Sequence, residues 1–151
     1  MEYRERLSAP AWYWLVGVAF GSTSALAMGL WFGIEAAIAG GLGLTALITI
    51  AIAWMGRTEI VVDGDGLRVG VNLLEWPWAG EVEALDTARA RALLGVEANA
   101  AAFEVQRPWL GEAVRIEVAD AADPHPYWFV STRRPAQLAA AIERARTKED
   151  S

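Results

Sequence analysis

The chain has 151 residues, no cysteine and a formal net charge of −6, and 54% of its residues are hydrophobic. The absence of cysteine excludes disulfides, thiolate metal sites and cysteine nucleophiles. From Arg57 onward the sequence holds eleven basic and sixteen acidic residues, a net charge of −5, and a domain of this sign disfavours nucleic acid as a partner.

Two long apolar segments dominate the N-terminal third. Neither residues 11–32 nor residues 36–55 include a charged side chain, and each segment has about the twenty residues that a helix needs to cross a bilayer. A helix of a soluble domain rarely stays apolar on every side over this length. We predict a transmembrane hairpin, in which a cytoplasmic N-terminal segment precedes two helices joined by a short extracytoplasmic turn. The predicted bounds are 1–10 for the segment, 11–33 and 36–56 for the helices, and 34–35 for the turn.

Basic residues flank only one side of this hairpin. Arg4 and Arg6 precede the first span and Arg57 follows the second, whereas the turn holds only Glu35. The positive-inside rule then places both termini in the cytoplasm. We therefore expect a two-span protein of the cell membrane, with the lipid bilayer as its first partner. The alternative is a signal peptide cleaved after Ala27. The sequence stays apolar beyond that position, which argues against cleavage there.

Small residues recur at every fourth position of the first span. Such a ridge allows another helix to approach closely. The helix-packing residues are Gly17, Gly21, Ala25, Gly29 and Gly33. We expect the ridge to pack against the second span; the alternative is a ridge left for a second copy of the chain or for another membrane protein. Because neither span holds an ionisable residue, a pore or transporter is the least favoured function.

The segment 57–147 is predicted to be a cytoplasmic β-rich domain, followed by a tail at 148–151. Period-two alternation and turn residues predict seven strands. They are expected at 59–63, 67–71, 74–78, 81–85, 103–107, 114–118 and 127–131. Turns at 64–66 and 108–111 predict one hairpin between the first two strands and another between the fifth and sixth.

Two helices are predicted in this domain. Asp86 is the expected N-cap of a short helix that ends at Leu94. Pro135 is the expected first residue of an amphipathic C-terminal helix over 135–147. In the last predicted strand Trp128 points to the opposite face from Tyr127 and Phe129. We therefore expect one of these two faces to be less buried.

The order of these elements favours an α+β membrane protein. We predict a two-helix transmembrane hairpin followed by a small antiparallel β barrel or sheet with a C-terminal helix, in the order found in pleckstrin-homology-like domains. An open α+β sheet covered by one helix is the alternative. Fold-level analogy does not fix function.

Short segments spread over nearly the whole chain carry a family resemblance. They are Tyr3-Arg4-Glu5-Arg6-Leu7, Gly56-Arg57-Thr58, Gly80-Glu81-Val82-Glu83-Ala84-Leu85, Arg107-Pro108-Trp109, Tyr127-Trp128 and Ser131-Thr132-Arg133-Arg134-Pro135. In these segments the chain resembles a family of small uncharacterised actinobacterial membrane proteins, which have an N-terminal helical hairpin and a short β-rich domain. The resemblance implies no catalytic or binding residues, because the family has no known function.

Four residues are candidates for binding an anion or a partner. Arg133 and Arg134 precede a predicted helix N-terminus, where guanidinium groups and free amides suit phosphate or carboxylate. Arg107 ends a predicted strand, and Trp109 lies at a hairpin tip where an exposed aromatic side chain can anchor a partner. The alternative is that the arginines pair with nearby acidic residues or with the inner leaflet of the membrane, and that the tryptophan folds back over its own core.

No constellation of residues typical of catalysis stands out. His125 is the only histidine, and with Asp120 and Asp123 it lies in one short loop, which is a poor metal cage. A triad with Ser131 lacks the nucleophile elbow that such hydrolases use. We expect no catalytic residue, no metal and no cofactor. The leading hypothesis is a non-enzymatic, membrane-anchored interaction or scaffold module; the alternative is a small receptor or enzyme that binds an anionic ligand near Arg107, Arg133 and Arg134.

Overall fold

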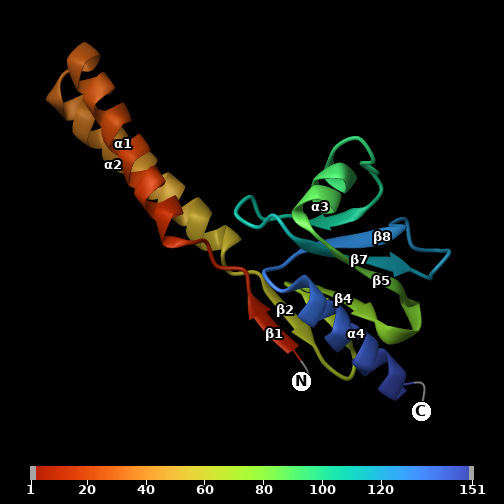
Figure 1. Cartoon of the computed structure of the whole chain (residues 1–151). Helices are drawn as coiled ribbons and strands as arrows, with labels where there is room; N and C mark the ends of the chain where they lie inside the picture. The colour runs from red at the N-terminus through yellow and green to blue at the C-terminus, as the bar shows by residue number, and fades with distance from the viewer. Residues whose placement is uncertain (1–2, 150–151) are drawn as a thin grey trace. The chain divides into compact units, whose positions relative to one another are not determined.

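The computed structural model describes residues 3–149 (Figure 1). It divides into two compact units, one formed by Ser8–Arg57 and the other by the residues before and after that segment. The first unit is helical and the second contains two sheets and two α-helices. The predicted mixed α+β class is confirmed.

The helical unit is a hairpin of α1 (Ala11–Phe32) and α2 (Ile34–Met55). Both helices are long and apolar enough to span a membrane, and only 11% of the residues in each apolar window are buried. Gly33 alone joins them, with φ +89°, a backbone conformation that favours glycine. The chain therefore reverses before Ile34 and Glu35, the two residues predicted to form the turn.

The first sheet is antiparallel, in the order β1-β2-β3-β4. Its strands are β1 (Tyr3–Arg6), β2 (Glu59–Val62), β3 (Gly66–Val69) and β4 (Asn72–Glu75). In the β1–β2 pair Tyr3 lies opposite Val62 and Arg6 lies opposite Glu59. The sequence did not predict β1. The segment before α1 contributes this strand to the domain that follows α2.

The second sheet is mixed, in the order β5-β7-β8-β6. Its strands are β5 (Ala79–Leu85), β6 (Phe103–Val105), β7 (Ala113–Val118) and β8 (Tyr127–Ser131). The predicted hairpin between residues 103–107 and 114–118 is wrong. Strand β6 runs parallel to β8, with Phe103 opposite Trp128, and β7 takes β5 and β8 as its neighbours.

A short 3₁₀ helix at Trp76–Trp78 separates the two sheets. The predicted strand at 74–78 is therefore wrong beyond Glu75, because Pro77 lacks the amide hydrogen that a sheet ladder needs. The two tryptophans consequently lie in different surroundings, Trp76 being 3% exposed and Trp78 44% exposed. The closed-barrel form of the prediction is also wrong, because residues 3–149 form two separate four-stranded sheets.

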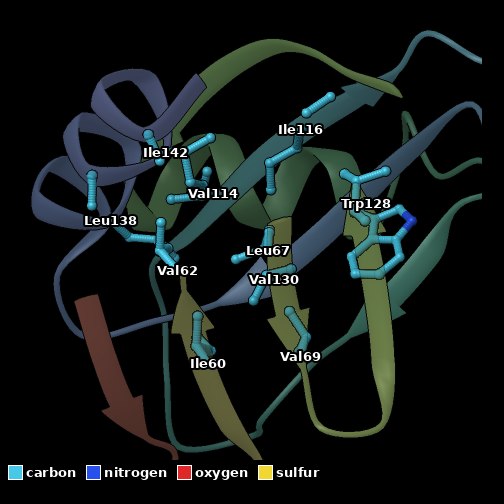
Figure 2. Packing of buried hydrophobic residues seen from close by; sticks show 14 of the residues in the cluster. Ile60, Val62, Leu67, Val69, Val114, Ile116, Trp128, Val130, Leu138 and Ile142 are labelled. Carbon is cyan, nitrogen blue, oxygen red and sulfur yellow. The ribbon is translucent and has the colours of Figure 1, made fainter. Parts of the chain in front are cut away.

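The larger core lies between the two sheets and the C-terminal helix α4 (Pro135–Glu149). Side chains from all three layers point toward one another (Figure 2). Representative members are Ile60, Val62, Val114, Ile116, Val130, Leu138 and Ile142, all 0% exposed. The apolar face predicted for the final helix is therefore confirmed as its buried face.

A second, smaller core lies on the other face of the second sheet, beneath α3 (Thr87–Leu94). The predicted N-cap of this helix is confirmed, since the Asp86 carboxylate accepts a hydrogen bond of 2.8 Å from the Arg89 amide. Helix α3 covers Tyr127 and Phe129, while Trp128 and Val130 face the larger core. All five residues of β8 are thus buried, and the expectation of a less buried face is wrong.

Candidate functional site

A polar cluster surrounds the carboxylate of Glu5 in β1, whose side chain is only 9% exposed. This carboxylate accepts hydrogen bonds from the Tyr3 hydroxyl at 2.7 Å, from the Thr132 hydroxyl and from the Arg133 amide at 3.0 Å. The Arg133 guanidinium group lies 3.7 Å from it. A buried carboxylate needs several donors of this kind, so Glu5 fixes β1 to the segment before α4.

Arg107 and Arg133 both bind where β1 ends and β2 begins. The Arg133 guanidinium group donates to the Arg6 carbonyl oxygen at 3.0 Å. The Arg107 guanidinium group donates to the Thr58 hydroxyl, and the Arg107 amide donates to Ser131 Oγ at 3.2 Å. Burial lowers the pKa of Arg107 from its ordinary value, although an arginine pKa starts far above neutrality.

Arg134 and Trp109 lie differently from these two arginines. The Arg134 side chain is exposed, and its amide donates to Thr132 Oγ1 at 3.1 Å. Trp109 is half-buried in a turn that the Leu110 amide closes on the Arg107 carbonyl oxygen at 2.9 Å. Leu110 packs against the larger core. The structure therefore brings Arg107 and Arg133 to one pair of strands, while Arg134 faces solvent.

The small residues of α1 face α2 within the hairpin. A Cβ atom at Gly17 would lie 2.9 Å from Ile48 Cγ2, and one at Gly21 would lie 2.1 Å from Thr45 Oγ1. Farther along, Gly29 faces Ala37 and Gly41 of α2 faces Ala25. Gly33 is the exception, because it forms the turn. The two helices therefore approach closely along four turns of α1.

The loop around His125 is held by one hydrogen bond to the backbone of Ala101 and one to the side chain of Asp123. His125 Nδ1 lies 2.8 Å from the Ala101 carbonyl oxygen, and the His125 amide donates to Asp123 Oδ1 at 2.8 Å. Ser131 Oγ accepts from the Arg107 amide instead of facing the histidine. Within residues 3–149 there is no group of three or more acidic, histidine or cysteine side chains that could hold a metal ion.

Sequence reasoning missed Tyr3, Glu5 and Thr132 of the polar cluster. It also missed Thr58, whose hydroxyl binds Arg107. The alternation of Tyr3 and Glu5 with Arg4 and Arg6 is a period-two signal for a strand. It was too short and too polar to stand out beside two long apolar segments.

Burial, together with the hydrogen bond to Glu5, raises the pKa of Tyr3 from 10.0 to about 12. The folded state therefore favours the neutral phenol. This contribution to stability is fully present below about pH 10 and is lost as the pH rises through about 12. As the pH is raised from about 10 to about 12, we expect the urea concentration at the midpoint of unfolding to decrease. The decrease should be smaller in Tyr3→Phe, which lacks the titrating hydroxyl. Equal alkaline losses in the two proteins would contradict the assignment.

Comparison with known proteins places the chain in a family without assigning it an activity. No curated protein and no solved structure is significantly similar to it. The model of a family described as protein of unknown function, DUF3093, matches residues 2–142. This match covers nearly the whole chain, including both apolar helices and the polar cluster around Glu5. The protein therefore belongs to the DUF3093 family.

Proposed function

We propose that the protein is a non-enzymatic interaction module, anchored in the cell membrane by α1 and α2, with both termini in the cytoplasm. One observation carries this proposal. Strand β1 precedes α1 and strand β2 follows α2, yet the two strands pair in one sheet. A chain that crosses a bilayer twice between two paired strands must return to the side from which it left.

The charges and the connectors support the same arrangement. Arg4, Arg6 and Arg57 flank the spans, and positive charge near the spans favours the cytoplasmic side. Residues 7–10 join β1 to α1, and residues 56–58 join α2 to β2. At about 3.5 Å per extended residue, such connectors hold the β-rich domain close to the bilayer.

The proposed partners are the bilayer and either a second copy of the chain or another membrane protein. The apolar side chains of α1 and α2 that face away from the hairpin suit lipid or a further helix; examples are Leu30, Phe32, Ile38, Leu42 and Leu47, all more than half exposed. A non-enzymatic role is supported by His125 and Ser131, whose side chains are both engaged with the protein backbone.

A receptor or enzyme acting on an anion at Arg107, Arg133 and Arg134 is the weaker proposal. Arg133 is already neutralised by Glu5, and the Arg107 guanidinium group binds the Thr58 hydroxyl and the Gln106 carbonyl oxygen. Arg134 is exposed. An anion that binds Arg133 would have to compete with the almost buried carboxylate of Glu5, which already lies 3.7 Å from the guanidinium group.

Cell fractionation and protease protection test the anchoring. We expect the full chain to sediment with membranes, to resist extraction by high salt and to dissolve in detergent. Tags at the two ends should survive protease added outside intact cells, and both should be cut after permeabilisation. Recovery of the protein in the aqueous fraction without detergent, or cleavage of either tag in intact cells, would refute the proposed topology.

A further inference from the structure

The β-rich domain has an open cleft on the α3 side of the second sheet. The cleft has a volume of about 330 Å³ and lies between α3, the loop after β6 and β8. This volume is at the lower end of the range for small-molecule sites. Gly111 lines the cleft close to α3: a Cβ atom at Gly111 would lie 3.0 Å from Thr87 Oγ1.

One guanidinium group in this cleft has no counter-charge in the described part of the chain. Arg91 lines the cleft and takes part in no hydrogen bond or ion pair within residues 3–149. Its neighbour on α3 is different, because Arg89 lies 2.6 Å from Glu97 and 3.8 Å from Glu83. The single positive charge of Arg91 is therefore open to a ligand.

Other polar groups of the cleft also have hydrogen-bonding capacity left. Ser131 is 1% exposed, and its oxygen accepts from the Arg107 amide. Among residues 3–149 nothing accepts the Ser131 hydroxyl proton. The Thr87 hydroxyl and the Gln106 amide also line the cleft and have no side-chain hydrogen bond in the described chain. A buried hydroxyl with an unused donor favours a ligand that brings an acceptor.

The rest of the cleft is apolar. Ala90, Leu94, Leu110 and Phe129 line it. Phe129 is 2% exposed and belongs to the smaller core. Apolar walls beside a few convergent polar groups are typical of sites for amphipathic small molecules.

We propose that this cleft binds a small monocarboxylate with an apolar body. A planar carboxylate can take two parallel hydrogen bonds from a guanidinium fork, and one negative charge matches the single arginine that lines the cleft. A dianion would be disfavoured by the net negative charge of the domain. At about 30 Å³ per water-sized group, the volume accommodates about eleven non-hydrogen atoms. The proposal is independent of the anchoring role, because it concerns a different surface of the chain.

The test uses the full chain in lipid nanodiscs and three probes that share one apolar body: 4-phenylbutyrate, 4-phenylbutanol and 4-phenylbutyl phosphate. Titration calorimetry, with empty nanodiscs as the blank, measures binding. We expect the carboxylate to bind at least about tenfold more tightly than the alcohol, because hydrogen bonds to charged groups are the stronger ones. Tighter binding of the phosphate, or failure of the carboxylate to bind, would overturn the proposal.

Variants assign any binding to the cleft. Arg91→Gln should weaken binding of 4-phenylbutyrate at least about tenfold. Arg144→Gln removes the same charge from an exposed position on α4, which packs on the larger core, and should leave binding unchanged. Leu94→Trp should fill the apolar part of the cleft and abolish binding; a thermal unfolding scan checks that this variant folds. Equal affinities for the wild type and Arg91→Gln would refute the site.

Discussion

Replacement of Leu7 by alanine is expected to lower the free energy of unfolding of the β-rich domain by about 3 kcal/mol. Leu7 directly follows β1 and precedes the first apolar helix, but it is 0% exposed and belongs to the larger core. Its amide donates to the Thr58 carbonyl oxygen at 2.9 Å, which extends the β1–β2 ladder. Removal of a buried leucine side chain loses its transfer free energy and leaves a cavity.

A matched control separates burial from the loss of an apolar side chain as such. Val71 is 99% exposed at the turn after β3, so Val71→Ala should change stability by less than about 0.5 kcal/mol. Guanidinium unfolding of both variants in detergent, followed by tryptophan fluorescence, measures the difference. If Leu7→Ala were as stable as Val71→Ala, the N-terminal segment would not be part of this core.

The elements that could be predicted from the sequence are those with local signals. Two uncharged segments predicted α1 and α2, and Asp86 as the N-cap of a short helix ending at Leu94 predicted α3 with its cap. The amphipathic pattern of residues 135–147 predicted that α4 has one buried face, which includes Leu138 and Ile142. In each case the pattern that stabilises the element lies within the element itself.

Strand pairing could not be predicted in the same way. Strand β1 exists because Tyr3–Arg6 meets Glu59–Val62 after the chain has passed through α1 and α2. Strand β6 has three residues and depends on a parallel neighbour, β8, that comes later in the chain. Such pairs depend on loop closure over long separations, on which local alternation carries no information.

The candidate site shows the same division. Arg107 and Arg133 stood out as arginines beside a strand end and a helix start. Their partners did not, because Glu5 lies 128 positions from Arg133 and Thr58 lies 49 positions from Arg107. The arginines in the sequence therefore indicated where the polar cluster lies. The structure shows that Glu5 of β1 already neutralises Arg133.

The second large effect is expected in the helical hairpin, where Gly41→Leu should separate α1 from α2. A Cβ atom at Gly41 would lie 2.5 Å from Ala25 Cβ and 3.4 Å from the backbone of Ala25. The backbone cannot give way as a flexible side chain can, so the helices must move apart. Overpacking of this kind costs about 2 kcal/mol, which corresponds to about a thirtyfold change in the population of the closed hairpin.

The absence of native cysteine allows a direct measurement. Cysteines are placed at Gly17 and Ile48, where a Cβ atom at residue 17 would lie 2.9 Å from Ile48 Cγ2 across the hairpin. They should form a disulfide on mild oxidation, and mass spectrometry quantifies it. In this background Gly41→Leu should reduce the yield strongly. Gly43→Leu adds the same side chain to the same helix, at a position with nothing within 4 Å, and should not. Equal yields in the two variants would mean that the small residues do not bring the helices together, and the outer face of α2 would then be the better candidate for contact with another helix.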